Sequence, residues 1–117
     1  MGKRVLIIDF DPDFCVEMTE FLRGAGIKAD YATTVEEGEA KLCNYNVLLL
    51  NYRTGKPSGF EILKKICKKA KNIAIFLVTG EPNIQAIAGK EGLSGYIRGY
   101  VEKPFDPEDI LDKIKAA

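Results

Sequence analysis

Short runs of consecutive apolar residues alternate along this chain with longer segments in which apolar residues recur every three or four positions. Few folds are compatible with such a pattern. A strand that is apolar on both sides has to be buried on both faces, as happens in a parallel sheet with helices above and below it. We therefore predict an α/β domain in which five strands alternate with five helices.

The predicted strands are the continuous apolar runs and their immediate neighbours. They cover residues 4–9, 28–32, 45–50, 73–78 and 96–101. Right-handed crossovers between parallel strands restrict this order of elements to a doubly wound sheet. In such a sheet a binding crevice forms outside the carboxyl ends of the strands, where the strand order reverses.

Four of the predicted helices begin with recognisable N-terminal signals. Asp11 and Asp106 are helix caps, and each is followed by a proline at the first helical position. Two other helices begin with capping boxes, which are Thr34-x-x-Glu37 and Ser58-x-x-Glu61. The remaining helix, near Ile84, is expected to be short because four glycines follow between residues 89 and 99.

Length and composition bound the class of protein. A chain of 117 residues with 46% apolar side chains fits one compact domain, and we expect that domain to span residues 1–117. The apolar runs are far shorter than the roughly 18 residues of a membrane span, so we expect a cytoplasmic protein without a membrane partner. Seventeen basic and seventeen acidic residues cancel, and no nucleic-acid partner is expected.

Cysteine and histidine content excludes several chemistries. Cys15, Cys43 and Cys67 are far apart, and the chain has no histidine to complete a zinc site, so we expect three reduced, buried cysteines. The absence of histidine also removes Ser-His and Cys-His nucleophile pairs. Because a phosphate-binding loop is missing as well, we predict that the chain is not an enzyme.

Four stretches of the sequence, taken in order, resemble the receiver domain of bacterial response regulators over almost the whole chain. They read VLIIDFDPDF, YNVLLLNYRTGKPSGFEIL, IFLVTG and YVEKPF. The resemblance implies a flavodoxin-like sheet with strand order 2-1-3-4-5. It also implies two-component (phosphorelay) signalling, in which an aspartate after the third strand accepts a phosphoryl group from a histidine kinase.

The same resemblance assigns residues to roles, position by position. Asp9 matches the first of two acidic residues that hold Mg²⁺ in the family. Thr79 and Lys103 match the residues that contact the phosphoryl group, and Tyr100 matches the aromatic residue that reports the signalling state. Pro104 matches a proline whose preceding peptide bond is expected to be cis.

Two positions depart from the family pattern. Phe10 stands at the second acidic position, and Asn51 stands at the phosphoacceptor position. A carboxamide is neutral and lacks the anionic oxygen that attacks phosphorus, so Asn51 should not be phosphorylated. With Asp9 as the remaining carboxylate, we expect no cofactor and weak or absent Mg²⁺ binding. We hypothesise that Lys103 pairs with Asp9 and donates to the Asn51 carbonyl, closing the crevice without metal.

The sequence thus indicates a degenerate pseudo-receiver that signals by protein–protein binding. Its expected partners are a histidine kinase, another two-component protein or a linked output domain. Receivers of the family that the chain resembles dimerise through the face of the fourth helix, fifth strand and fifth helix, so we also consider a homodimer through this face. Tyr96, Ile97 and Tyr100 lie on that face.

Other interpretations remain at this stage. The chain could be a conventional phosphorylatable receiver that carries an engineered aspartate-to-asparagine change at Asn51. It could instead be a small-molecule sensor with Phe10 as a stacking platform, although packing of Phe10 against its surroundings is the simpler interpretation. Asp11 could replace a missing metal ligand, but its position before Pro12 favours a helix cap.

Overall fold

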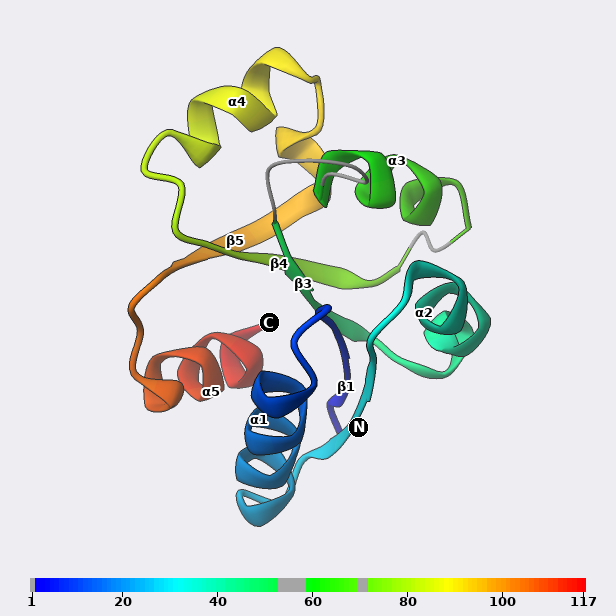
Figure 1. Ribbon diagram of the computed structural model, residues 1–117, viewed down its shortest axis with the longest axis vertical. Coiled ribbons are helices and arrows are strands. Elements are labelled where there is room, and N and C mark those ends of the chain that lie inside the picture. The colour runs from blue at the N-terminus through cyan, green and yellow to red at the C-terminus, as the bar shows by residue number, and fades with distance from the viewer. Residues whose placement is uncertain (1, 53–58, 70–71) are drawn as a thin grey trace.

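The computed structural model describes residues 2–52, 59–69 and 72–117, and these residues contain a five-stranded, fully parallel sheet (Figure 1). Its strands are β1 (Arg4–Ile8), β2 (Lys28–Ala32), β3 (Val47–Asn51), β4 (Ala74–Thr79) and β5 (Ile97–Glu102). Their order is β2-β1-β3-β4-β5, which confirms the doubly wound fold. The predicted bounds of β3, β4 and β5 are wrong by one or two residues, because each of these strands begins and ends later in the chain.

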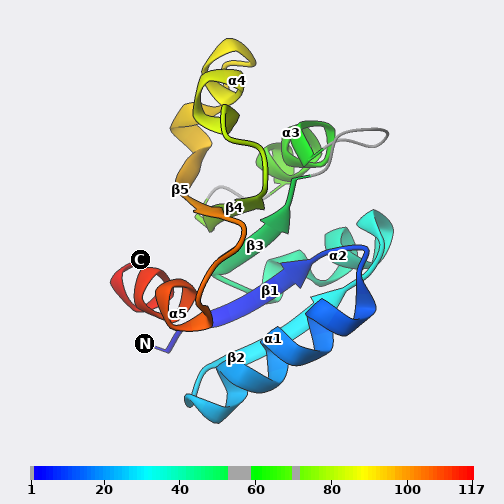
Figure 2. The same ribbon diagram turned by 60° about the vertical axis from the view of Figure 1, so that its left-hand side comes forward.

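Helices cover both faces of the sheet (Figures 1 and 2). They are α1 (Pro12–Gly24), α2 (Val35–Lys41), α3 (Gly59–Lys69), α4 (Ile84–Lys90) and α5 (Pro107–Ala116), with short 3₁₀ turns η1 (Leu42–Asn44) and η2 (Ser94–Tyr96). Helices α1 and α5 pack on one face, and α2, α3 and α4 pack on the other. Helix α4 has seven residues, so the expectation of a short helix is confirmed.

The two faces explain why the strands are apolar throughout. In β1, Leu6 and Ile8 point into the cluster under α2, α3 and α4, whereas Val5 and Ile7 point into the cluster under α1 and α5. Successive side chains of a strand alternate between faces, so burial on both sides needs an unbroken apolar run. The predicted burial of Phe60, Cys67 and Ala70 lies outside the side chains that the structure describes.

Helix caps follow the sequence signals with one variation. The side chain of Asp11 accepts hydrogen bonds from the backbone of Asp13 and Phe14, and Asp106 caps α5 in the same manner. Thr34 Oγ1 accepts from the backbone nitrogen of Glu37, but the Glu37 carboxylate accepts from Thr33 rather than from Thr34. The second predicted capping box includes Ser58, which lies outside the described residues.

The prediction that the cysteines are buried is correct for Cys15 and wrong for Cys43, which is exposed. Cys43 lies in η1, a single turn in which the neighbouring Leu42 fills the core position. A turn this short presents one side to the core, and Cys43 lies on the other. In the part of the chain that the structure describes, each helix is too short or too polar to cross a bilayer.

Candidate functional site

Four polar side chains meet at the carboxyl edge of the sheet. Asp9 follows β1, Asn51 ends β3, Thr79 ends β4 and Lys103 follows β5. The backbone nitrogen of Lys103 donates to the Thr79 carbonyl oxygen at 2.7 Å, which continues the β4–β5 ladder into the site. The side chains of Asp9, Asn51 and Thr79 are at most 7% exposed, and the strands around them are apolar. Buried polar groups need partners, so their hydrogen bonds define the site.

A chain of hydrogen bonds links Lys103, Asn51 and Asp9. Lys103 Nζ donates to Asn51 Oδ1 at 3.2 Å, and Asn51 Nδ2 donates to Asp9 Oδ1 at 3.3 Å. The expected bond from Lys103 to the Asn51 carbonyl is therefore present. The Asn51 carboxamide bonds to both charged groups, and the hypothesised direct pairing of Lys103 with Asp9 stays a prediction.

A side chain that is both donor and acceptor occupies this middle position. The Asn51 carbonyl oxygen accepts from the ammonium of Lys103, and its amide nitrogen donates to the carboxylate of Asp9. An aspartate would accept from Lys103 equally well, but it would present a second negative charge to Asp9. The arrangement therefore depends on the amide.

An open pocket of about 400 Å³ borders this chain of hydrogen bonds. Its lining residues are Asp9, Phe10, Asp11, Phe14, Asn51 and Lys103. Lys103 Nζ lies 5.9 Å from the centroid of the Phe14 ring, within the range of a cation–π contact. Phe14 and Phe105 pack edge to face, with 5.9 Å between ring centroids and 84° between planes.

Sequence reasoning missed this aromatic wall. No role in the site was predicted for Phe14, which is partly buried and lines the pocket. Its place in the first turn of α1, directly after the end of β1, is the signal that could have revealed it. Phe105 follows Pro104, and the cis Lys103–Pro104 peptide bond is confirmed.

Phe10 and Asp11 occupy the loop between β1 and α1. Phe10 is partly buried and packs against the core cluster beneath α2, α3 and α4, in agreement with the packing interpretation. Asp11 is exposed, and its side chain caps α1 as expected. Its backbone nitrogen also donates to Asp9 Oδ1 at 2.9 Å. That single carboxylate oxygen thus accepts two hydrogen bonds, from Asp11 and from Asn51.

Thr79 and Tyr100 lie beside this chain of hydrogen bonds. Thr79 Oγ1 accepts from the backbone nitrogen of Glu81 at 2.9 Å, so the hydroxyl orders the loop that leads to α4. Tyr100 is partly buried against the cluster beneath α3 and α4, and this burial raises the pKa of its hydroxyl. Among the described residues, neither the Thr79 hydroxyl nor the Tyr100 hydroxyl hydrogen-bonds to the side chain of Asn51 or Lys103, and Thr79 contacts Lys103 through the backbone hydrogen bond between them.

Cys15 is a second residue of the site region that the sequence did not point to. Its Sγ donates to the Asp9 carbonyl oxygen at 3.4 Å. Burial, reinforced by the negative charges of Asp9 and Asp11, raises the pKa of this thiol to about 12. Cys15 therefore remains a protonated thiol at neutral pH and fixes the backbone of Asp9 instead of acting as a nucleophile.

The profile of the response regulator receiver domain matches residues 5–115 of the chain. The chain belongs to this family. A receiver domain from Methanospirillum hungatei superposes with a TM-score of 0.84 at 29% identity, covering 99% of this chain and 93% of that one. The response regulator TrrA from Thermotoga maritima, in complex with Mg²⁺–BeF, superposes with a TM-score of 0.79 at 28% identity, covering 97% of each chain.

Curated relatives of this receiver are longer than the chain itself. The acid tolerance regulatory protein ActR of Sinorhizobium medicae is 27% identical over 111 residues, which are 93% of this chain and 56% of ActR. Another relative, the adventurous-gliding motility protein Z of Myxococcus xanthus, is matched over only 8% of its length, at 28% identity across 94% of this chain. The similarity therefore concerns the receiver portion of these proteins.

The donor set of this receiver does not fit a Mg²⁺ site. Mg²⁺ requires near-octahedral oxygen ligands, usually including one or two carboxylates. No cluster of three or more histidine, cysteine, aspartate or glutamate residues suited to a metal occurs in the described ranges. Phe10 supplies no oxygen, and the Asn51 oxygen is bonded to the cationic Lys103. Among the described residues of the pocket wall, Asp9 and the cap Asp11 are the only carboxylates.

Proposed function

We propose that this receiver domain signals by binding a protein partner and does not accept a phosphoryl group at Asn51. The observation that carries the proposal is the Asn51 carboxamide, hydrogen-bonded at both ends between Lys103 and Asp9. Phosphoryl transfer to a receiver requires an anionic oxygen nucleophile, and a carboxamide offers none. We assign no catalytic residue, and the lack of histidine in the chain supports this.

The same chain of hydrogen bonds supports a metal-independent site. In a site with several carboxylates, a divalent cation offsets their mutual repulsion. Here the ammonium of Lys103 and the carboxylate of Asp9 balance each other through the neutral amide of Asn51. We propose that Mg²⁺ binds weakly or not at all, and that the closed site exists without it.

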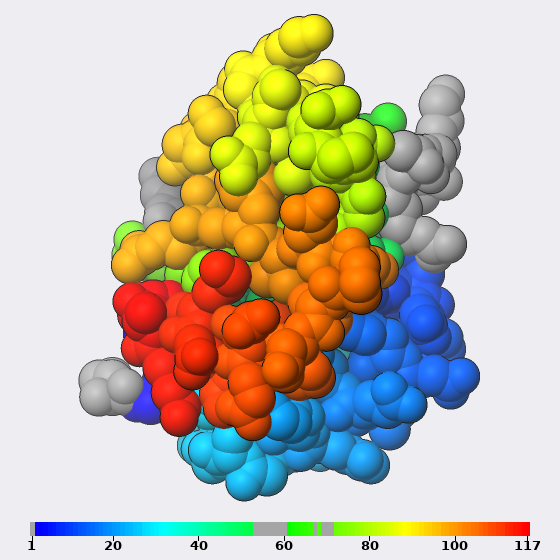
Figure 3. All heavy atoms as spheres, turned by 90° about the vertical axis from the view of Figure 1, so that its left-hand side faces the viewer, coloured from blue at the N-terminus to red at the C-terminus, as the bar shows by residue number. Residues whose placement is uncertain are grey.

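The proposed partners are a histidine kinase, another two-component protein or an output domain linked to the receiver. A surface available for them is the face of α4, β5 and α5 (Figure 3), where β5 lies between the two helices. Tyr96, the last residue of η2 and directly before β5, is 56% exposed and offers an aromatic side chain to a partner. A homodimer through this face belongs to the same proposal.

Acetyl phosphate tests the absence of phosphorylation. The unaltered protein is incubated with acetyl phosphate and Mg²⁺, and its intact mass is measured alongside that of the double variant Phe10→Asp/Asn51→Asp. We expect no added phosphate on the unaltered protein and one on the double variant. A phosphate located on the unaltered protein at residue 51 would disprove the proposal.

A binding experiment tests the second half of the proposal. Cognate histidine kinases and regulators are captured with the unaltered protein and with the double variant, each with and without acetyl phosphate. We expect the unaltered protein to retain the same partners in both conditions. Asn72→Asp, which makes the same chemical change at an exposed position, serves as the control. Capture that depends on acetyl phosphate for the unaltered protein would contradict phosphorylation-independent binding.

A further inference from the structure

Strand β2 is an edge of the sheet, with β1 on one side and no strand on the other. The Ala32 carbonyl oxygen accepts from Asp9 N, so the backbone groups of Ala32 face β1. Backbone groups of successive residues in a strand alternate in direction. The nitrogen and oxygen atoms of Ala29, Tyr31 and Thr33 therefore face away from the sheet, where a further strand could bond to them.

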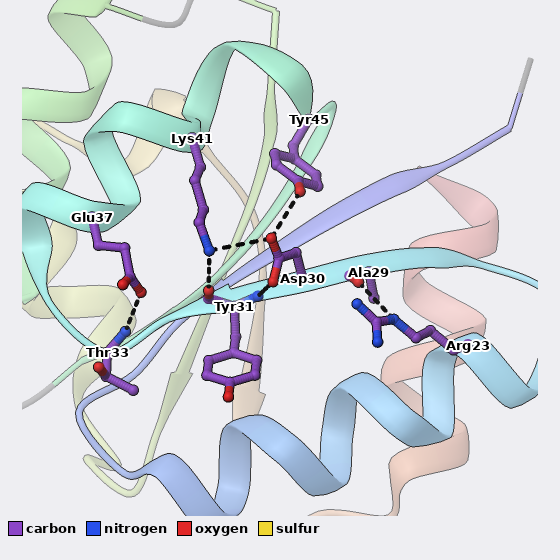
Figure 4. Close-up of polar contacts among 8 residues, drawn as sticks. All are labelled: Arg23, Ala29, Asp30, Tyr31, Thr33, Glu37, Lys41 and Tyr45. Carbon is purple, nitrogen blue, oxygen red and sulfur yellow. Dashed lines mark hydrogen bonds and ion pairs between the residues drawn. The ribbon is translucent and has the colours of Figure 1, made fainter.

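Side chains already form hydrogen bonds with four of these outward-facing backbone groups (Figure 4). Arg23 Nε donates to the Ala29 carbonyl oxygen at 3.0 Å, and Lys41 Nζ donates to the Tyr31 carbonyl oxygen at 3.0 Å. The other two groups are donors. Tyr31 N donates to Asp30 Oδ1 at 2.7 Å, and Thr33 N donates to Glu37 Oε1 at 3.3 Å.

Lys41 is itself held in place. Its ammonium lies 3.2 Å from Asp30 Oδ2, and the Tyr45 hydroxyl donates to the same oxygen at 3.3 Å. Partial burial opposes ionisation of Asp30, but hydrogen bonds from Tyr31 N, Lys41 and Tyr45 together hold its pKa below the ordinary value. Asp30 is therefore a carboxylate at neutral pH, and it orients the ammonium toward the strand edge.

We propose that Arg23, Asp30, Glu37 and Lys41 form an edge clasp that prevents β2 from pairing with the β2 strand of a second copy of the chain. Unpaired strand edges are templates for sheet extension, and charged side chains placed on the edge are a general means of blocking it. The clasp draws its members from α1, β2 and α2, so it closes the edge from both faces of the sheet. An incoming strand has to displace charged side chains from these backbone groups.

The opposite edge of the sheet lacks an equivalent arrangement. On β5, the register against β4 shifts between Ile75 and Phe76, where the ladder is irregular. Such irregularities bend an edge strand and disturb regular pairing. No side chain of a described residue has a recorded hydrogen bond to the backbone of β5. Side-chain closure is thus particular to β2 and is not a general feature of the sheet edges.

The test removes the two cationic donors of the clasp but keeps apolar side chains at both positions. The double variant Arg23→Met/Lys41→Met removes both donors, and self-association is measured by sedimentation velocity over a wide concentration range. We expect half-association at a concentration roughly tenfold below that of the unaltered protein, since two backbone acceptors become free. Infrared spectra of the associated material should show added intermolecular β-sheet.

Two matched variants complete the experiment. Lys65→Met/Lys68→Met removes two exposed cations of α3, away from β2, and should associate like the unaltered protein. Lys41→Arg, with Arg23 unchanged, keeps a donor for the Tyr31 carbonyl oxygen and should associate like the unaltered protein. If the double variant does not fold, the single variants Arg23→Met and Lys41→Met are compared with the unaltered protein in the same experiment. Folded clasp variants that associate no more than the unaltered protein would overturn the proposal.

Discussion

Two lysine–aspartate clusters in this receiver solve the same electrostatic problem differently. At the β2 edge, Lys41 and Asp30 form a direct ion pair of 3.2 Å between side chains that are each about one-third exposed. At the carboxyl end of the sheet, the Asn51 carboxamide hydrogen-bonds to both Lys103 and Asp9 and so links the two. Asp9 is 3% exposed, so its carboxylate is almost fully withdrawn from solvent.

The difference shows what burial demands. An ion pair whose side chains are about one-third exposed keeps much of its hydration, so it loses little solvation energy and adds little to the stability of the fold. A buried carboxylate needs hydrogen-bond donors on its oxygens, because the loss of hydration otherwise exceeds the attraction of a nearby cation. At Asp9 these donors include the neutral Asn51 amide and the backbone of Asp11. The amide also gives Lys103 an acceptor, so one neutral group serves both charged side chains.

The substitution Asn51→Asp should break this comparison most strongly. It places a second carboxylate next to Asp9, where an amide now donates over 3.3 Å. We expect the free energy of unfolding at pH 7 to fall by about 2 kcal/mol or more without Mg²⁺, because two buried like charges repel and a donor is lost. Urea denaturation with and without Mg²⁺ measures the effect.

Two features separate repulsion from general damage at this position. Mg²⁺ should restore part of the stability of Asn51→Asp, and so should acidification, because protonation of one of two neighbouring carboxylates removes their repulsion. Asn72→Asp, at an exposed site, should show neither response. An Asn51→Asp variant as stable as the unaltered protein in metal-free buffer would mean that the amide is not needed.

Removing each lysine in turn sharpens the contrast. Lys103→Met leaves the Asn51 carbonyl without its ammonium donor, and we expect a loss of about 1–2 kcal/mol. Lys41→Met breaks a half-exposed ion pair and should cost less than about 1 kcal/mol. Both are measured by urea denaturation at pH 7, with the corresponding arginine variants as controls. Equal losses would show that the buried and exposed clusters do not differ as argued.

Much of the fold could be predicted because it follows from local rules. The apolar runs predicted the parallel sheet, and caps followed by proline, such as Asp11 and Asp106, predicted the helix starts. Gly38 shows what local rules miss. It lies within α2, where glycine is unfavourable, and only the structure explains it: a Cβ atom there would lie 2.5 Å from Ile8 Cδ1. Such close packing between distant segments leaves no local signal.

The site was predictable in its membership but not in its bonding. The predicted strand ends identified the site residues, because parallel strands place their carboxyl ends together. These residues are Asp9, Asn51, Thr79 and Lys103. The order of contacts depends on side-chain reach, and sequence reasoning did not predict that the Asn51 amide nitrogen donates to Asp9. The β2 edge clasp was also missed, since its members are spread from Arg23 to Lys41, and Glu37 was predicted only as part of a capping box.

Acidification should remove the contribution of Asp30 to stability. The pKa of Asp30 in the folded protein is below its ordinary value of 3.8, so the stabilisation is present above that value and is lost as the pH falls through the lower, folded-state pKa. Asp30→Asn should therefore be less stable than the unaltered protein at pH 7 by less than about 1 kcal/mol. The gap should close at strongly acidic pH, and a gap that persists there would point to packing instead of charge.

The smallest expected effect concerns the hydroxyl of Tyr45. Tyr45→Phe removes one hydrogen bond to Asp30 and should lower the free energy of unfolding by about 0.5 kcal/mol. Because the lost donor favoured the charged carboxylate, the pKa of Asp30 should rise toward its ordinary value in a carboxyl NMR titration. Tyr31→Phe is the matched control, since no hydrogen bond from its hydroxyl to a described residue is recorded. If the two variants shift Asp30 equally, the Tyr45 hydroxyl does not act on Asp30 through its hydrogen bond, and the clasp is held by Lys41 and the backbone alone.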